Sequence, residues 1–162
     1  MNGTLELADF IKNEQKDPIL ICFVCTGNTC RSPMAAAVYN DLAAKSGLPS
    51  RAISAGLYPD GISISPNAAR ALADAGIEPT AQNDYLHHIP RPVSEALIDR
   101  CERLVGISSA HAMELMMRFP RYAGKITSLS RDISDPYGGD VERYRRCLAE
   151  ITAVIREGFF QC

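Results

Sequence analysis

Four short stretches of the chain are rich in apolar and β-branched residues and predict buried β-strands. The clearest is PILICFVC, a continuous apolar run that is too short for a buried helix. Such runs are typical of strands covered on both faces of a sheet. The segments RAISAG, RLVGI and KITSL have a similar length and character. The four predicted strands cover residues 18–25, 51–56, 103–107 and 125–129.

Between these strands lie segments of helical length with recognisable start and stop signals. Ser-Pro pairs at 32–33 and 65–66 each place a proline in a first helical turn, where its missing N–H is tolerated. Gly47 and Gly76 are positioned to end the same two helices. The last segment carries its apolar residues on one face. The five predicted helices cover residues 32–47, 65–76, 93–100, 109–119 and 139–158.

Strand and helix alternate four times along the chain, which predicts βαβ units with parallel strands. We therefore expect an α/β fold of three layers, in which a doubly wound parallel sheet lies between helices. Residues 1–17 stand apart as an N-terminal extension, and residues 18–162 are expected to form one domain.

Composition and charge narrow the classes of function. The chain has 162 residues, of which 46% are hydrophobic, which is enough for one domain with a core. It has no long apolar run and an acidic start, so neither a membrane span nor a signal peptide is predicted. Its six cysteines are therefore expected to stay reduced in the cytoplasm. A net charge of -2 gives no general attraction to nucleic acid or anionic lipid, so any bound anion needs a local site.

The stretch CFVCTGNTCRSPM follows the first predicted strand and leads into the first predicted helix. In open α/β sheets ligands bind at this position, where backbone amides and the helix dipole favour an anion. Gly27 and Asn28 suit such a loop because both tolerate the left-handed backbone region. The candidate phosphate-binding loop comprises Cys25, Thr26, Gly27, Asn28, Thr29, Cys30 and Arg31.

Two side chains of this loop indicate phosphoryl-transfer chemistry. A thiolate at Cys25 would be stabilised by the same amides and dipole, so we expect a lowered pKa and a reactive nucleophile. Arg31 offers a planar, two-pronged contact to two phosphate oxygens, which lysine does not copy. The bare C-x5-R spacing arises by chance in cysteine-rich chains, so the preceding strand and the following helix start are what support the prediction.

The motif VCTGNTCRSPMA resembles the signature of the low molecular weight protein tyrosine phosphatases. DPYGG at 135–139 resembles their general-acid loop, and SAG at 54–56 and HIPRPVS at 88–94 resemble intermediate blocks. The resemblance covers about residues 18–160. It implies a flavodoxin-like sheet of four parallel strands flanked by helices. It also implies a phosphatase that binds phosphate or similar oxyanions and acts on phosphorylated proteins through a cysteinyl-phosphate intermediate, without metal or other cofactor.

The resemblance makes Asp135 the proton donor. A phosphoester leaving group needs a proton as it departs, and the same carboxylate can then take one from the attacking water. Pro136 stiffens the loop that presents this carboxylate. Asp-Pro is also a common turn dipeptide, and Asp132 is the nearest competing carboxylate, although Pro-Tyr does not follow it.

The resemblance also implies a supporting hydrogen-bond network around the loop. Its members are Asn28, Ser32, Ser54 and His88, which would hold the loop and place a hydroxyl near the thiolate. The alternative is that His88 is an ordinary surface or core histidine, and the adjacent His87 competes with it for this role.

Two further positions bear on the substrate. Tyr137 is expected to flank the pocket mouth, where its ring would lie against the substrate side chain. Eukaryotic members often have a second tyrosine next, whereas this chain has Gly138. The chain instead resembles the bacterial branch that includes protein arginine phosphatases, which have threonine at the position of Thr29. A hydroxyl there favours phosphoarginine over phosphotyrosine, and the alternative is that Thr29 only packs.

The cysteines allow other interpretations. Cys22 and Cys25 have the C-x2-C spacing of zinc and dithiol sites, but a strand places them on opposite faces, and a zinc site needs four ligands. Cys22 is therefore expected in the core. Cys30 is either a small packed residue or the partner of Cys25 in a reversible disulfide that protects the nucleophile from over-oxidation.

Two alternative functions compete with the phosphatase. Thioredoxin-linked arsenate reductases share this fold and loop, but they work as a relay of cysteines and carry two more cysteines after the third strand. Residues 105–120 contain none. A non-enzymatic anion-binding module is the other alternative, and it would not require both Cys25 and Asp135.

Overall fold

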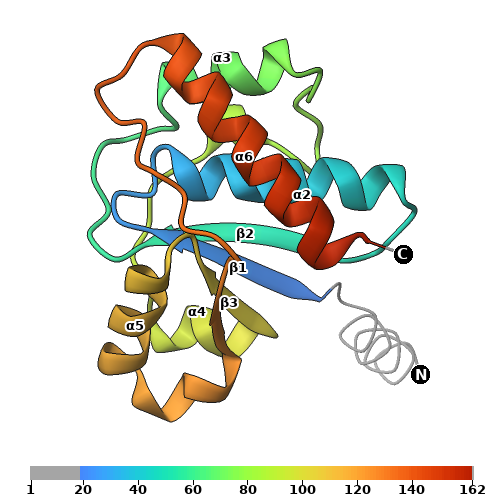
Figure 1. Cartoon of the computed structure of the whole chain (residues 1–162). Helices are drawn as coiled ribbons and strands as arrows, with labels where there is room; N and C mark the ends of the chain where they lie inside the picture. Colours follow the sequence, from blue (N-terminus) through green and yellow to red (C-terminus); the bar gives the residue numbers. More distant parts are fainter. Residues whose placement is uncertain (1–18, 162) are drawn as a thin grey trace, which may run out of the picture.

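The computed structural model describes residues 19–161, which form a sheet between two layers of helices (Figure 1). The predicted N-terminal extension, residues 1–17, lies outside the described residues. Within residues 19–161, no helix combines the length and the apolar character needed to cross a membrane. The strands are β1 (Leu20–Cys25), β2 (Arg51–Gly56), β3 (Arg103–Gly106) and β4 (Ile126–Ser128). The helices are α2 (Arg31–Lys45), α3 (Pro66–Asp74), α4 (Glu95–Arg100), α5 (Ser109–Arg118) and α6 (Val141–Phe159).

All nine predicted strands and helices are present, and their ends differ from the predictions by at most two residues. Sequence reasoning missed two short 3-10 helices, η1 (Tyr85–His87) and η2 (Pro120–Lys125). Neither has the apolar periodicity that identifies longer helices, because each is a single turn or two that depends on tertiary contacts.

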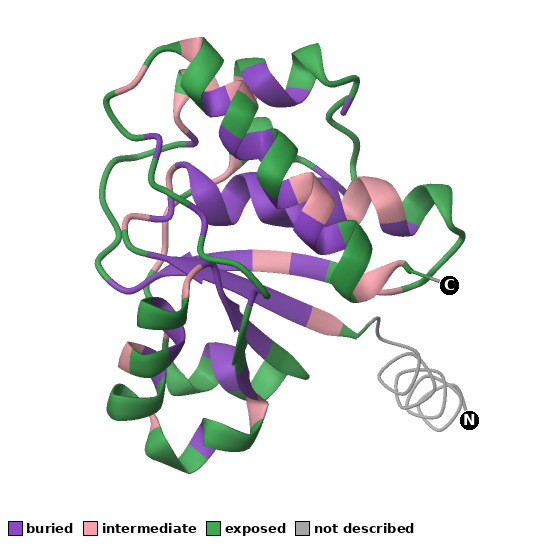
Figure 2. Cartoon of the chain, in the orientation of Figure 1, coloured by how far each residue is buried: buried purple, intermediate pink, exposed green. Residues whose placement is uncertain are grey.

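The four strands are parallel and lie in the order β2-β1-β3-β4, which confirms the predicted fold class. Helices α2, α3 and α6 cover one face of the sheet, and α4 and α5 cover the other (Figure 1). The buried residues concentrate between these layers (Figure 2). Because β1 is central, its side chains alternate between two cores: Phe23 and Cys25 belong to the first, and Cys22 and Val24 to the second. The predicted core position of Cys22, on the face opposite to Cys25, is confirmed.

The carboxyl ends of β2, β1 and β3 meet at one edge of the sheet. Cys25 pairs with Gly56 in the β1–β2 register, and Val24 pairs with Gly106 in the β1–β3 register. Glycine is needed at Gly56, where an added Cβ would lie 2.8 Å from the Thr26 carbonyl oxygen. This close approach lets the loop after β1 fold down against β2.

Candidate active site

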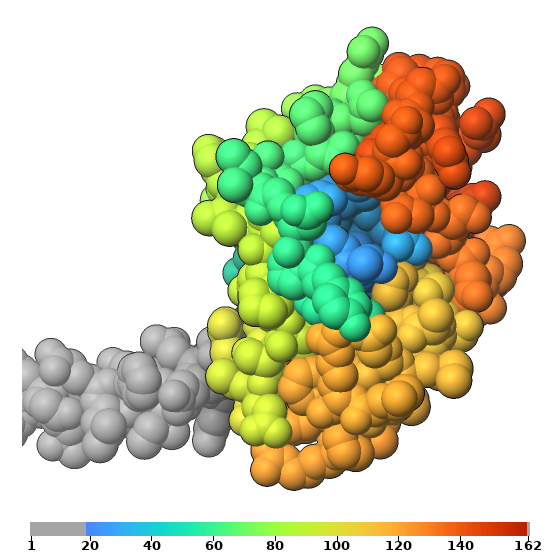
Figure 3. Space-filling model, turned by 90° about the vertical axis from the view of Figure 1, so that its left-hand side faces the viewer, coloured from blue at the N-terminus to red at the C-terminus, as the bar shows by residue number. Residues whose placement is uncertain are grey.

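The loop that follows β1 forms the base of a pocket at this edge of the sheet. Figure 3 shows the blue residues of the loop in a hollow, bordered by the teal residues after β2 and the orange residues before α6. The pocket has a volume of about 190 Å³. It is lined by residues 25–31 together with Tyr58, Asp60, Asp135 and Tyr137. The structure thus brings the predicted nucleophile, arginine, carboxylate and tyrosine to one pocket.

Asn28 organises the loop from inside the protein. It is fully buried and has a positive φ of 59°, as the sequence suggested for this position. Its side-chain amide donates to Ser32 Oγ at 2.8 Å and to Ser54 Oγ at 3.0 Å, and its Oδ1 accepts from the Arg91 backbone amide at 3.1 Å. These bonds tie the loop to α2, to β2 and to the segment before α4, so the strained residue is held by three separate elements.

The structure also decides between the two adjacent histidines. His88 is half-buried, and its Nε2 lies 2.7 Å from the Asn28 carbonyl oxygen, to which it donates. His87 is exposed and pairs with Asp84 on the surface. Burial lowers the pKa of His88, so the ring stays neutral near pH 7 with its proton directed at the loop. His88 therefore joins Asn28, and through it Ser32 and Ser54, in the arrangement that the resemblance implied.

Cys25 lies at the buried base of the pocket, with its Sγ 2.9 Å from Ser32 Oγ. Ser32 Oγ accepts a bond from Asn28, and its own proton can be donated to the Cys25 sulfur or to the Ala55 carbonyl oxygen, which lies 3.4 Å away. Burial raises the pKa of the Cys25 thiol. The Ser32 hydroxyl, the Ser32 and Asn28 amides and the Arg31 guanidinium act in the opposite direction without cancelling it. The expectation of a lowered pKa was therefore wrong, because sequence reasoning counts the groups that stabilise a thiolate but not the water that folding removes.

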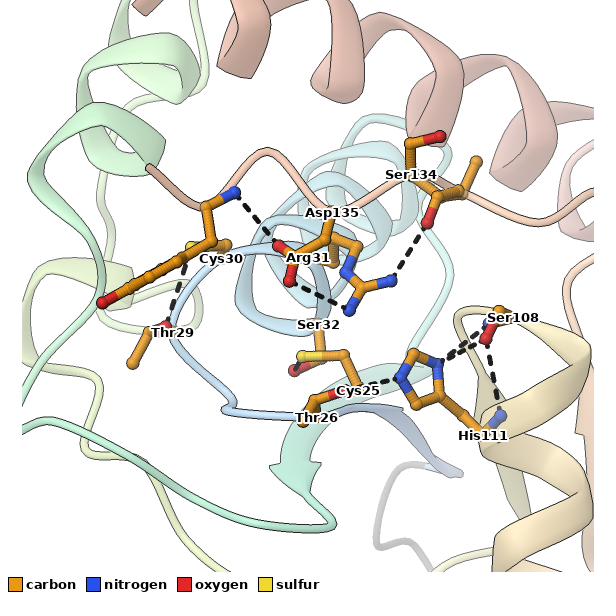
Figure 4. Close-up of polar contacts among 12 residues, drawn as sticks. Cys25, Thr26, Thr29, Cys30, Arg31, Ser32, Ser108, His111, Ser134 and Asp135 are labelled. Atoms are coloured by element: carbon orange, nitrogen blue, oxygen red, sulfur yellow. Dashed lines mark hydrogen bonds and ion pairs between the residues drawn. The ribbon is translucent and has the colours of Figure 1, made fainter. Parts of the chain in front are cut away.

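Arg31 and Asp135 lie side by side at the pocket and form an ion pair (Figure 4). Arg31 begins α2, is buried, and donates through Nη1 to the Ile133 carbonyl oxygen at 3.0 Å. Its Nη2 lies 3.6 Å from Asp135 Oδ2. Asp135 is half-exposed, and its other oxygen accepts from the Tyr137 amide at 3.1 Å. The buried guanidinium is thus held rigidly, whereas the carboxylate stays accessible from the pocket.

Asp132, the competing carboxylate, has a different role. Its two oxygens accept from the amide and the hydroxyl of Ser109, at 2.9 and 3.3 Å, at the start of α5. It is absent from the residues that line the pocket. Geometry therefore favours Asp135 as the carboxylate that meets a bound substrate.

The metal alternative finds no support in the described part of the chain. Across residues 19–161, no three His, Cys, Asp or Glu side chains converge as metal ligands would. Cys22 and Cys25 lie in different cores, so they do not form a pair. Cys30 is buried next to Tyr144, with 3.3 Å between its Sγ and the tyrosine hydroxyl, and it is a free thiol like Cys25.

Sequence reasoning missed His111, which contacts the phosphate-binding loop from α5. Its Nε2 lies 3.0 Å from Thr26 Oγ1 (Figure 4). Its Nδ1 accepts from the Ser108 backbone amide at 3.2 Å, so the proton of the neutral ring is on Nε2 and is donated to Thr26. Burial, followed by the charge of Arg31, lowers the pKa of His111 to about 4. The available signal was a Ser-x-x-His capping box directly after a strand, but the sequence does not say which loop such a histidine meets.

Acid is expected to destabilise the protein through His111. Its pKa is about 4 in the folded protein against 6.5 for a free histidine. As the pH falls below 6.5, the unfolded chain therefore binds a proton before the folded protein does. The stabilising effect of the neutral ring is full above about pH 6.5 and is lost as the pH falls toward 4. Between about pH 7 and pH 5, wild type should lose about 2 kcal/mol more unfolding free energy than His111→Gln, which donates to Thr26 but does not titrate. Urea denaturation measures this difference, and equal losses in the two proteins would contradict the assignment.

Comparison with known proteins agrees with this geometry. The family model of the low molecular weight phosphotyrosine protein phosphatase matches residues 20–160. A protein-arginine-phosphatase of Bacillus subtilis (strain 168) is 32% identical over 146 residues, which cover 85% of this chain and 92% of the relative. A low molecular weight protein-tyrosine-phosphatase of Streptomyces coelicolor is 32% identical over 149 residues, with 82% and 87% covered.

A solved structure shows the same likeness in three dimensions. It is a cysteine-to-serine mutant of the YwlE arginine phosphatase with a phosphorylated active-site serine. Its TM-score is 0.77 at 31% identity, over 86% of this chain and 92% of that chain. The family model, the relatives and the shared fold lead to one conclusion: the chain belongs to the low molecular weight phosphotyrosine protein phosphatase family, a family of phosphoric monoester hydrolases.

Proposed function

We propose that the protein removes phosphate from phosphorylated proteins, with phosphoarginine favoured over phosphotyrosine, and that residues 18–162 form the phosphatase unit. The observation that carries the proposal is the meeting of three groups in one small pocket. The Cys25 sulfur lies at its base, the buried Arg31 guanidinium at its side, and the accessible Asp135 carboxylate next to Arg31. A module that only bound anions would have no use for a carboxylate beside its arginine, since the two charges oppose each other toward phosphate.

The proposed reaction has two steps. Cys25, as a thiolate, attacks phosphorus while Arg31 and the loop amides hold the equatorial oxygens. The bond to the leaving group breaks, and protonated Asp135 gives its proton to the departing nitrogen or oxygen. In the second step Asp135 takes a proton from water, the water oxygen attacks phosphorus, and the sulfur–phosphorus bond breaks with the electron pair returning to Cys25. The Ser32 hydroxyl, 2.9 Å from the sulfur, stabilises the thiolate in both steps, before it attacks phosphorus and as it is released.

Two observations support this scheme. The relative solved as a cysteine-to-serine mutant carries phosphate on its active-site serine, as expected if the corresponding cysteine accepts the phosphoryl group. The buried polar network behind the loop uses Asn28, Ser32 and Ser54, so the base of the pocket is preorganised before a substrate arrives. A reducing compartment such as the cytoplasm suits this mechanism, because Cys25 reacts only as a free thiolate.

The proposed preference for phosphoarginine rests on Thr29. Its half-buried side chain lines the pocket, with Oγ1 facing the loop at 3.6 Å from Cys30 Sγ. A hydroxyl accepts a hydrogen bond from a guanidinium N–H, whereas an isoleucine methyl group packs better against a phenol ring. Curated relatives named protein-arginine-phosphatase are among the most similar to this chain.

Thr29→Ile is expected to shift the preference toward phosphotyrosine. The ratio of kcat/KM for phosphoarginine over phosphotyrosine, measured with two peptides of otherwise identical sequence, should fall by about tenfold or more. Thr127→Ile is the matched control, because Thr127 is exposed on the edge strand β4, away from the pocket. If the ratio in Thr29→Ile equals that of wild type, Thr29 is not the selector.

A further inference from the structure

The pocket contains a second carboxylate, Asp60, for which the proposed mechanism has no use. Asp60 lies between β2 and α3 and lines the pocket. The segment between β2 and α3 forms a wall that borders the phosphate-binding loop (Figure 3). The Asp60 backbone amide donates to the Gly27 carbonyl oxygen at 3.0 Å. The Tyr58 amide donates to the Thr26 carbonyl oxygen at 2.8 Å. These bonds hold the wall against the loop, so Asp60 has a defined place at the pocket.

A contact from α5 fixes the same segment from outside. Arg118 donates to the Leu57 carbonyl oxygen at 3.0 Å, and its guanidinium stacks on the Tyr58 ring at 4.5 Å. The wall is therefore anchored on both sides of Tyr58, two residues before Asp60. A side chain presented by such a segment can take part in recognition without a large ordering cost.

Among the described residues, the carboxylate of Asp60 has no cationic partner. Its Oδ1 accepts from the neighbouring Gly61 amide at 2.9 Å, and across residues 19–161 no Lys, Arg or His forms an ion pair with it. Arg31 is the cationic residue among those that line the pocket. An exposed, unpaired carboxylate beside the site of a doubly charged phosphate weakens binding of that phosphate. Its presence is explained if the substrate also brings a positive charge to the same wall.

Phosphoarginine has such a charge, and phosphotyrosine does not. In phosphoarginine the phosphorus is bonded to a guanidinium nitrogen, so the remaining N–H groups and the delocalised positive charge lie directly beside the phosphate. In phosphotyrosine the same space holds a neutral ring that offers no donor. Carboxylates bind guanidinium groups with short, charge-assisted and often paired hydrogen bonds.

We propose that Asp60 determines substrate specificity by binding the guanidinium group of phosphoarginine from the wall formed by the segment after β2. This inference rests on the proposed function. Asp135, on the opposite side, protonates the nitrogen that leaves phosphorus, while Asp60 accepts from the nitrogens that are not bonded to phosphorus. The two carboxylates thus have separate tasks, one in proton transfer and one in binding.

Asp60→Asn tests the proposal, because it removes the charge and keeps the shape and the acceptor for the Gly61 amide. Against phosphoarginine and phosphotyrosine peptides of the same sequence, kcat/KM for phosphoarginine should fall by about tenfold, mainly through a higher KM. For phosphotyrosine it should rise by about twofold, and inorganic phosphate should inhibit at a lower concentration, since a like charge has been removed.

Glu102→Gln is the matched control. Glu102 is an exposed residue next to the amino end of β3, at the opposite edge of the sheet. The substitution therefore removes the same charge far from the pocket. The kinetic constants of the variant should stay within about twofold of wild type.

The outcomes separate this inference from the function beneath it. If wild type does not hydrolyse the phosphoarginine peptide, the proposed preference and the role of Asp60 both fail. If wild type prefers phosphoarginine and Asp60→Asn keeps the wild-type ratio of the two substrates, only the role of Asp60 is overturned. An unchanged inhibition constant for phosphate in Asp60→Asn would also overturn it, because the carboxylate would then not face the phosphate site.

Discussion

Cys25→Ser is expected to lower turnover of phosphoarginine and phosphotyrosine peptides by about 10⁴-fold or more. A serine hydroxyl is a weak nucleophile near neutral pH unless a base removes its proton. The Cys25 side chain contacts the Ser32 hydroxyl, which is no base. The loop amides and Arg31 remain in the variant, so it should still bind phosphate with nearly the affinity of wild type.

Steady-state kinetics, phosphate binding and thermal unfolding of the same variant together test the nucleophile. Cys101→Ser is the matched control, because Cys101 is a buried thiol in the core on the other face of the sheet. It should retain turnover at temperatures well below its unfolding midpoint. A Cys25→Ser protein that is folded and still turns over near the wild-type rate would exclude the cysteinyl-phosphate mechanism.

Asp135→Asn is expected to lower kcat by about 10²- to 10³-fold for substrates whose leaving group needs a proton. The asparagine amide has nearly the shape of the carboxyl group but cannot transfer a proton to the leaving atom. The phenolate of an aryl phosphate with a strongly acidic phenol departs without a proton. For such a substrate the substitution should therefore slow the phosphorylation of Cys25 less. The signature of this role is therefore a kcat that depends more steeply on the leaving group in Asp135→Asn than in wild type.

Asp132→Asn supplies the comparison. It lies three residues earlier in the same connection, and its oxygens accept bonds from Ser109 rather than facing the pocket. It should keep kcat within about threefold of wild type. A large loss in Asp132→Asn together with normal turnover in Asp135→Asn would reverse the assignment of the proton donor.

The phosphate-binding loop was readable from the sequence because its signals are local. An apolar strand, residues that tolerate positive φ and a Ser-Pro helix start all lie within about fifteen positions of Cys25. The alternation of strands and helices likewise predicted the sheet, since local periodicity and the handedness of crossovers leave few topologies. These features depend on neighbours along the chain.

The histidines show where local signals end. His87 and His88 are adjacent, and no pattern distinguishes them, whereas their burial and partners differ clearly once the chain is folded. His111 is 85 positions from Thr26, and only the packing of α5 against the edge of the sheet brings the two side chains to 3.0 Å. A contact between such distant residues has no local signature.

The sequence by itself determined the chemical groups of this protein: a cysteine and an arginine in one loop between a strand and a helix, and a fold that places this loop at the edge of a parallel sheet. The tertiary structure decided the surroundings of those groups. It surrounds Cys25 with enough protein to raise its pKa, sets Asp135 rather than Asp132 next to Arg31, and brings Asp60 and His111 to the loop. The reason is physical: local conformation follows from neighbouring residues, whereas desolvation and charge–charge contacts depend on which distant segments pack together.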